Sequence, residues 1–302
     1  MITFTFLSGK QIEFDISKKY KGFYCKYFYH IKSYVLDETQ YCYCTLTYNT
    51  KEIKDIDKII NYDNIEINVT IKYIYNYKLI DWIDIDKLDL SRLSLNPKAI
   101  QLLVENKEKI NWKLLSANPN AIHLLEKNID EIYWYYLSKN PNAIHLLEEN
   151  KEKIDLYYYL SANPNAICLL EENEEKINWS LLSLNPNAIH LLKKNIDKID
   201  WDYLSENPNA IKILKKHKNK INWDYLSFNP SAINLLKTNK EKISWNFLSV
   251  NQNAIQLLEE NKEKMNWLFL SSNPNATHLL QENEEKICWV ELSENLSIFE
   301  EE

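Results

Sequence analysis

The sequence predicts an α+β protein with a small mixed domain, rich in strands, over residues 1–75, followed by an all-α solenoid of nine two-helix repeats over residues 96–302. One pattern of about 22 residues returns along the second region. The first region instead carries short runs of alternating polar and apolar residues, which are typical of strands. Residues 76–95 join the two parts and are expected to form a linker and an N-terminal cap half-repeat.

The repeat begins with an asparagine that recurs at a regular period of about 22 residues. These asparagines are Asn96, Asn118, Asn140, Asn163, Asn185, Asn207, Asn229, Asn251 and Asn273. A fixed period of this length is the signature of a solenoid, in which each unit buries its apolar face on its neighbours. We therefore expect an elongated stack about 80–90 Å long, if each repeat adds about 9–10 Å.

The inside of one repeat predicts two helices. All eight prolines of the chain stand at the second repeat position, where proline suits the first turn of a helix and the preceding asparagine can cap it. In the repeat at 185–206, Leu191 and Leu192 lie on the apolar face of a helix of about ten residues. Asn195 is expected to end this helix in a left-handed conformation, and Trp201 lies on a second, short helix.

Tryptophan occupies one position in most repeats and is expected to form a buried spine. These residues are Trp112, Trp134, Trp179, Trp201, Trp223, Trp245, Trp267 and Trp289. Replacing a central one with alanine should cost about 3–5 kcal/mol. The ends of the array are atypical: residues 88–95 match the closing half of a repeat, with Leu90 at the tryptophan position, and residues 295–299 begin a tenth copy and stop. We expect both to cap the stack.

Residues 1–75 read as a hairpin, a helix, a strand, a short helix and a last strand. Alternation predicts the hairpin over 2–6 and 11–16 and the two later strands over 42–48 and 65–74. Helical spacing of aromatic and apolar residues predicts a helix over 23–35, and 54–60 could hold a short helical turn.

Three stretches give this region a resemblance to ubiquitin and its β-grasp relatives. They are the turn at residues 7–10, the strand and turn at 46–53, and the stretch 61–65 before the final strand. The resemblance implies a ubiquitin-like fold for residues 1–75. Two features differ: the chain continues beyond Tyr73 instead of ending in a free Gly-Gly, and the polar Thr47 stands where the family has the central isoleucine of its receptor patch. Conjugation through this domain is therefore not expected.

The repeats carry a second resemblance. Their Asn-Pro start and leucine-rich helix are similar in layout to the leucine-rich repeat variant family, which stacks an α-helix and a 3₁₀-helix into a superhelix. The sequence motif Leu-Ser-x-Asn-Pro-Asn-Ala-Ile-His-Leu-Leu resembles more closely the repeats found in proteins of the giant DNA viruses of amoebae, such as those related to Mimivirus. That resemblance implies a viral protein in the host cytoplasm and no known activity.

Charge and composition limit the possible classes of function. The net charge is -7, and the repeat region is acidic, so phosphate-rich nucleic acid and anionic lipid are poor partners. No apolar run approaches the roughly 18–20 residues of a membrane-spanning helix, and the first residues lack the features of a signal peptide. Five scattered cysteines favour a reducing compartment. We expect an intracellular, cytoplasmic protein.

The residues with catalytic chemistry favour no enzyme. Counting each repeat asparagine as position 1, histidine recurs at position 6, and we read neither carboxylate nor cysteine as repeating beside it at metal-ligand spacing. Both glycines lie in the first domain, which excludes glycine-rich phosphate loops from the repeats. The abundant carboxylates fall on faces predicted to be solvated. No cofactor, metal or catalytic residue is therefore predicted.

The favoured function is a protein-interaction scaffold that binds its partner through variable, outward repeat positions. The candidate contact residues are His123, His145, His190, Lys194, Lys212, Lys216, Asn234, Gln256 and His278. A first alternative is a substrate adaptor in a ubiquitin pathway, with the ubiquitin-like head docking the machinery. A more remote alternative is an RNA-binding repeat protein that uses the locally basic stretch 212–220. The oligomeric state is left open.

Overall fold

The computed structural model describes residues 2–6, 11–14, 42–48, 51–52, 65–73, 77–153 and 157–301. The first part contributes a five-stranded sheet in the order β2-β1-β5-β3-β4. Its strands are β1 (Ile2–Phe6), β2 (Gln11–Phe14), β3 (Cys42–Tyr48), β4 (Lys51–Glu52) and β5 (Ile65–Tyr73). The predicted hairpin and both later strands are confirmed. The helices predicted over 23–35 and 54–60 lie outside the described residues.

The sheet is mixed. β1 pairs antiparallel with β2 and parallel with β5, with Ile2 opposite Ile65 across the parallel pair. β3 runs antiparallel to both β5 and β4. The first and last long strands of this part therefore lie side by side at the centre of the sheet.

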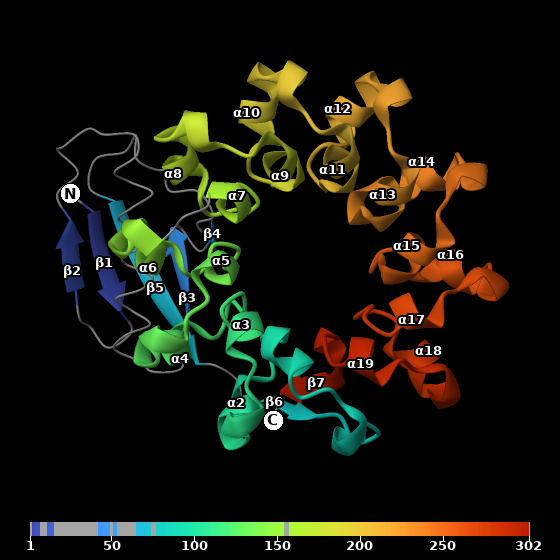
Figure 1. Cartoon of the computed structure of the whole chain (residues 1–302), viewed down its shortest axis with the longest axis horizontal. Helices are drawn as coiled ribbons and strands as arrows, with labels where there is room; N and C mark the ends of the chain where they lie inside the picture. Colours follow the sequence, from blue (N-terminus) through green and yellow to red (C-terminus); the bar gives the residue numbers. More distant parts are fainter. Residues whose placement is uncertain are drawn as a thin grey trace.

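Each following repeat consists of an outer α-helix, one turn of 3₁₀-helix and a short inner α-helix (Figure 1). The outer helices are α2 (Ile100–Glu105), α4 (Ile122–Lys127), α6 (Ile144–Glu149), α8 (Ile167–Glu171), α10 (Ile189–Lys194), α12 (Ile211–Lys216), α14 (Ile233–Lys237), α16 (Ile255–Glu259) and α18 (Thr277–Gln281). The inner helices are α3 (Trp112–Leu115), α5 (Trp134–Leu137), α7 (Tyr157–Leu160), α9 (Trp179–Leu184), α11 (Trp201–Glu206), α13 (Trp223–Phe228), α15 (Trp245–Val250), α17 (Trp267–Leu270) and α19 (Trp289–Leu292). The predicted two-helix solenoid repeat is confirmed.

The repeat asparagine makes a turn before the outer helix instead of capping the helix itself. In the repeat of α10, the Asn185 side chain accepts from the amide of Asn187 at 2.9 Å, and the helix begins only at Ile189. The helix also ends differently from the prediction. Asn195 has φ -129° and ψ 54°, which is not left-handed, and its side-chain amide donates to the carbonyl of Leu191 at 3.0 Å. An amide side chain can close the helix in this way without positive φ.

Two ladders of buried hydrogen bonds join consecutive repeats. In the first, the Asn207 side-chain amide donates to the carbonyls of Ser183 and Asn185, both at 2.9 Å. In the second, the hydroxyl of Ser183 accepts from the backbone amide of Asp200 at 3.0 Å. The asparagine and serine are fully buried, so each bond satisfies a polar group that would otherwise be costly to bury.

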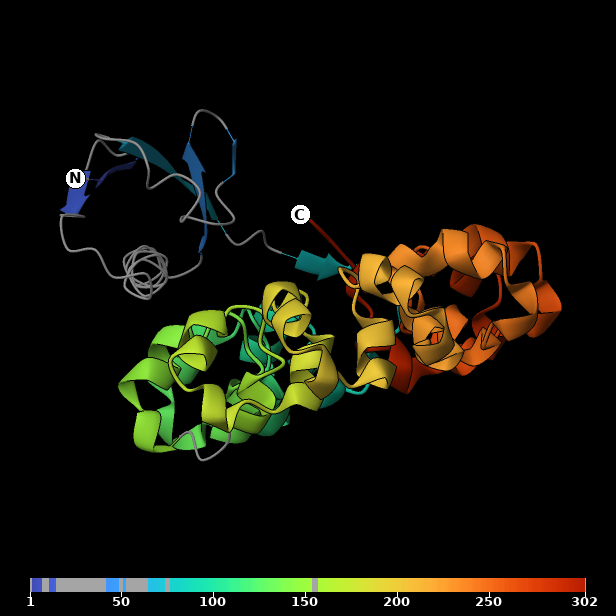
Figure 2. The same cartoon turned by 90° about the horizontal axis from the view of Figure 1, so that it is seen from above.

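The ladders do not stop at the ends of the array but close on themselves. The Asn96 side-chain amide donates to the carbonyls of Ser293 and Asn295, at 3.3 and 3.0 Å. The backbone amide of Asp89 donates to the hydroxyl of Ser293 at 2.9 Å. The repeats therefore form a closed ring, shown face-on in Figure 1 and turned by 90° in Figure 2. The elongated stack expected from the sequence is wrong.

The two atypical ends together build a tenth unit of this ring. Asn295 opens it, followed by β7 (Phe299–Glu301), which pairs antiparallel with β6 (Tyr77–Leu79). The 3₁₀-helices η2 (Ile85–Lys87) and η3 (Arg92–Leu95) then complete it. The two half-repeats are thus not separate caps. Each supplies the half that the other lacks, and neither leaves an exposed end.

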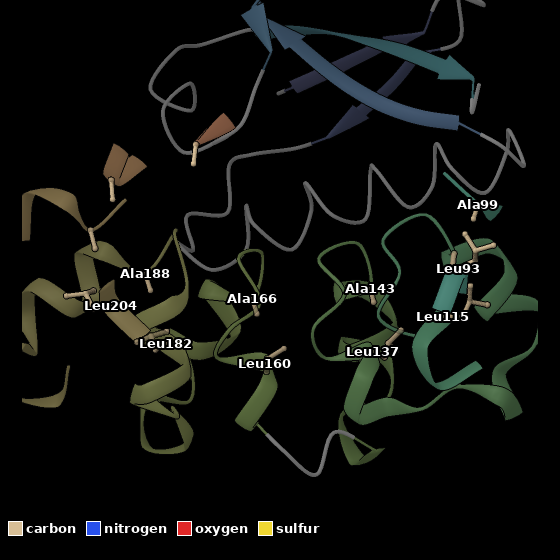
Figure 3. Close-up of a cluster of buried hydrophobic side chains, with 14 of the residues drawn as sticks. Leu93, Ala99, Leu115, Leu137, Ala143, Leu160, Ala166, Leu182, Ala188 and Leu204 are labelled. Atoms are coloured by element: carbon tan, nitrogen blue, oxygen red, sulfur yellow. The ribbon is translucent and has the colours of Figure 1, made fainter. Parts of the chain in front are cut away.

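The core is a continuous circle of leucine and alanine between the inner and outer helices. Figure 3 shows part of it, with Leu115, Leu137 and Leu182 of the inner helices in one layer with Ala143 and Ala188 at the start of the outer ones. These five side chains have no exposed surface. The apolar face predicted for the outer helix therefore lies where it was expected.

The tryptophans are less buried than the sequence predicts. They are only partly buried and pack against the edge of the core. A lysine of the next repeat covers each of several indoles: Lys242 lies 4.6 Å from the ring centre of Trp223, and Lys198 lies 4.4 Å from that of Trp179. The same contact crosses the closure, where Lys87 lies 4.9 Å from Trp289. The predicted buried spine is in fact a series of cation-π stacks near the surface.

Two other sequence expectations concern membranes and cysteines. None of the helices in residues 77–153 and 157–301 combines the length and apolar character that crossing a bilayer requires. Cys288 is a free thiol, whereas Cys168 is disulfide-bonded. The reducing compartment inferred from the cysteine pattern stays a prediction.

Candidate functional site

The inner helices turn one side towards the centre of the ring, and this side is the inner face. Each inner helix directs positions 20 and 21 into the core, where Leu226 and Ser227 are fully buried in α13. With 3.6 residues per turn, positions 18, 19 and 22 then lie on the opposite side. In Figure 1 these helices are seen nearly end-on, inside the circle of outer helices. The inner face is defined here as positions 18, 19 and 22 of the ten units.

Four consecutive aromatic side chains at position 19 form an aromatic arc on the inner face. Successive ring centres of Tyr203, Tyr225, Phe247 and Phe269 lie 6.0, 6.2 and 6.3 Å apart. Packed helices have axes about 8–10 Å apart, so rings spaced more closely than the helices that carry them must converge on the centre. All four side chains are only partly buried. The arc is thus a wall of aromatic surface that faces inwards.

Large apolar side chains extend this surface. Leu268 is 48% exposed, Val290 42% and Phe228 36%, all on the inner face. Isolated exposed apolar residues are common, but a contiguous group that includes aromatic rings marks a binding surface more often than not. The inner face therefore has the composition of an interface core, in which aromatic residues are enriched.

A basic cluster lies on the inner face of the first repeats. Tyr135 and Tyr159 meet edge-to-face with ring centres 4.2 Å apart. Lys139 lies 3.9 Å from the ring centre of Tyr159, and Lys113 lies 5.1 Å from that of Tyr136. In this part of the ring, the protein's own ammonium groups cover its inward aromatic rings.

Acidic residues flank the aromatic arc instead. Asp202 and Asp224 occupy position 18 beside Tyr203 and Tyr225 and are exposed. One oxygen of Asp202 accepts from the side-chain amide of Asn222 at 2.9 Å. Glu206, at position 22, is partly buried, and this burial raises the pKa of its carboxyl above the ordinary value. The arc and the basic cluster thus have opposite charge.

An ion-pair group marks the point where the ring closes. The Arg92 guanidinium lies 2.6 Å from the Glu294 carboxylate and 3.3 Å from that of Glu291, and these contacts raise the pKa of Arg92. Lys98 donates to the carbonyl of Phe299 at 3.1 Å. These contacts join the first and last repeats. The charge of Arg92 also compensates the carboxylates of Glu291 and Glu294.

The contact residues predicted from the sequence lie on the outer helices, away from the inner face. Lys194, Lys212, Lys216, Asn234 and Gln256 are exposed there, on the four successive outer helices α10, α12, α14 and α16. All five side chains are polar or charged, and none is aromatic like those of the arc.

The histidines of position 6 pair with the preceding repeat, a relation that the sequence reasoning missed. Nε2 of His145, His190 and His278 lies 2.8, 3.0 and 3.1 Å from a carboxylate oxygen of Glu126, Glu171 and Glu259. The sequence does hold the signal, since a glutamate stands 19 positions before each of these histidines. The inference that no carboxylate recurs beside them is wrong.

Two of these histidines are not outward residues. His145 is buried with 7% exposure, so the expectation that position 6 faces solvent is wrong there. His123 is partly buried. This burial is the main cause that lowers its pKa, and the charge of Lys127 lowers it further. Within the described residues, no group of three or more histidine, cysteine, aspartate or glutamate side chains could hold a metal ion.

Comparison with known proteins gives no relative. No family model, no curated protein and no solved structure matches this chain. The resemblances noted from the sequence stay predictions.

Proposed function

We propose that this protein is a non-enzymatic binding ring that holds a segment of a partner protein against its inner face. The aromatic arc carries the proposal, because four partly exposed aromatic rings in one row are the kind of surface that dominates binding energy in protein interfaces. The scaffold function inferred from the sequence is kept. Its binding surface moves from the outer helices to the inner face.

The dimensions of the ring favour a single segment of chain as the occupant. With ten units to the circle, aromatic rings about 6 Å apart lie about 10 Å from the centre and trace a circle about 20 Å across. An α-helix with its side chains is about 10–12 Å across. One helix or one extended segment fits through such a circle, whereas a folded domain is too wide.

Site-specific photo-crosslinking in the native cell tests the proposal. A photoreactive phenylalanine analogue at Leu268 places the probe on the inner face, and the same analogue at Gln256 places it on the outer helix of the same unit. We expect crosslinks to a defined polypeptide segment from Leu268 but not from Gln256. Crosslinks from Gln256 alone would move the binding surface back to the outer helices and overturn the proposal.

A second proposal concerns residues 1–75, which we infer to be ubiquitin-like. The strand order β2-β1-β5-β3-β4, with a central parallel pair, supports this inference. Such a domain would make the protein an adaptor that brings the ring's partner to the ubiquitin machinery. Co-purification with the full chain, compared with residues 77–302 alone, tests it. The adaptor role is wrong if both versions recover the same proteins.

A further inference from the structure

Lysine ammonium groups of the protein itself cover some of the aromatic side chains on its inner face. Lys139 lies 3.9 Å from the ring centre of Tyr159 and 5.9 Å from that of Tyr136, and Lys113 adds a second ammonium over Tyr136. On the ring's surface, lysines cover six of the eight repeat tryptophans at 4.4–4.9 Å in the same way, whereas Trp201 packs against His217. As a rule, a lysine therefore covers the partly exposed tryptophans of the described repeats.

The aromatic arc departs from this rule. Among the described residues, no lysine or arginine stacks on Tyr225, Phe247 or Phe269, although the same position is covered in the second and third repeats. The flanking acids are also uncompensated, since neither Asp202 nor Asp224 forms an ion pair with a basic side chain of the described part. Among the described side chains, the arc therefore has the acceptor groups of a cation site without a basic side chain stacked on its rings.

We propose that the aromatic arc binds lysine and arginine side chains of the partner segment, stacked on the rings of Tyr225, Phe247 and Phe269 and paired with Asp202 and Asp224. The inference rests on the proposed function and specifies the chemistry of the partner. Arginine suits the site best, because its planar guanidinium stacks on aromatic faces and binds carboxylates with directed hydrogen bonds.

The occupant is therefore an amphipathic segment with basic and apolar residues. The apolar residues meet Leu268 and Phe228 on the same wall, and the basic ones meet the acids and the ring faces. The acidic flank disfavours nucleic acid, because phosphates would be repelled by the carboxylates that attract a basic peptide. An anionic surface beside apolar contacts thus selects a polypeptide by charge.

Three fluorescent peptides test the inference with the full chain. Each is about 18 residues long, which gives a helix of about 27 Å, and carries leucines at the same positions. The remaining positions hold arginine in one peptide, neutral citrulline in the second and glutamate in the third. Fluorescence anisotropy at low and moderate salt measures the dissociation constants, and we expect the arginine peptide to bind most tightly and the glutamate peptide most weakly.

Variants assign the binding to the arc. Phe247→Leu keeps an apolar side chain but removes the aromatic face, and it should weaken the arginine peptide about fivefold, the equivalent of one cation-π contact. The double change Asp202→Asn and Asp224→Asn should weaken it severalfold at low salt and flatten its salt dependence. Gln256→Leu on the outer helix α16 is the matched control and should leave binding unchanged. Circular dichroism confirms that each variant is folded.

Equal binding of the arginine and citrulline peptides, or full binding by Phe247→Leu, would overturn the inference. The crosslinking experiment separates this failure from that of the proposed function. A crosslinked segment poor in lysine and arginine removes the inference and leaves the binding ring standing. The absence of any segment at Leu268 removes both.

Discussion

The closed ladder makes a prediction that an open solenoid does not share: an asparagine at the end of the repeat region should be as important as one at its centre. Asn207 makes three hydrogen bonds, to the carbonyls of Ser183 and Asn185 and from the amide of Asn209. Asn96 makes the equivalent three, to the carbonyls of Ser293 and Asn295 and from the amide of Lys98. Both asparagines are almost completely buried.

The cost of each substitution follows from these bonds. A hydrogen bond contributes about 1 kcal/mol net, so Asn207→Ala and Asn96→Ala should each lower the free energy of unfolding by about 3 kcal/mol, and by more where a carbonyl is left without a partner. In an open array, the Asn96 amide would face water, and Asn96→Ala would remove only the local turn bond, at about 1 kcal/mol. The difference between the two variants therefore reports on closure.

Urea unfolding followed by far-ultraviolet circular dichroism measures these costs. Asn209→Ala is the matched control, because this exposed asparagine makes one bond, to the carbonyl of Pro186 at 2.9 Å, and its loss should cost less than about 1 kcal/mol. The slopes of the transitions must agree among variants, since repeat proteins can lose cooperativity. A cost at Asn96 close to that of the control, beside a full cost at Asn207, would refute the closed ring.

Three further outcomes are expected from urea unfolding. Trp223→Ala should cost less than Leu226→Ala, at about 1–2 against about 3–4 kcal/mol, because the indole is only partly buried and the leucine fully so; the reverse order would restore the buried spine. Burial lowers the pKa of His123, so stability should fall as the pH drops through the ordinary value of 6.5, and His123→Gln should flatten this slope. Burial raises the pKa of Glu206, so its contribution to stability is lost as the pH rises above the ordinary 4.5; Glu206→Gln should raise stability at pH 7 and not at pH 4.

The repeat, its boundaries and its core could be predicted because they are local and periodic. The leucine pattern of 185–206 places Leu192 and Leu204 in the core by spacing alone, and the position of Pro186 marks the start of the turn. The strands of the first part follow from alternation in the same way. The fine structure of the helix ends could not be predicted, because an asparagine such as Asn195 can end a helix in two ways. It can adopt a left-handed conformation, or its side-chain amide can donate to a carbonyl of the last turn.

Closure could not be predicted from one repeat, because it is the sum of ten small rotations of about 36° each. A hint was nevertheless present in the ends. Residues 88–95 supply a closing half and residues 295–299 an opening half, and together they make one complete unit. Two complementary halves at the ends of a repeat region favour a ring over a capped stack.

The binding surface that we propose differs from the one expected from the sequence for a related reason. If the array is assumed to be linear, aromatic residues at a fixed position, such as Tyr225 and Phe247, are expected in the hydrophobic core. Variable polar residues such as Gln256 are then expected on the recognition surface. In a ring, the inner face is neither buried nor fully exposed, so its residues share the apolar character of a core with the accessibility of a surface. Under the proposed function, the binding residues would therefore be those that recur at position 19, and not those that vary most among the repeats.

Closure also fixes how charge is distributed around the inner face. Five units separate Lys113 from Asp224, which is half of the ten-unit circle, so the basic cluster faces the acidic side of the aromatic arc across the ring. The ammonium groups of Lys139 and Lys113 repel cations, whereas the carboxylates of Asp202 and Asp224 attract them. Under the proposed function, a basic segment inside the ring would therefore be pushed towards the arc from one side and held by it on the other, which an open solenoid with the same residues could not do.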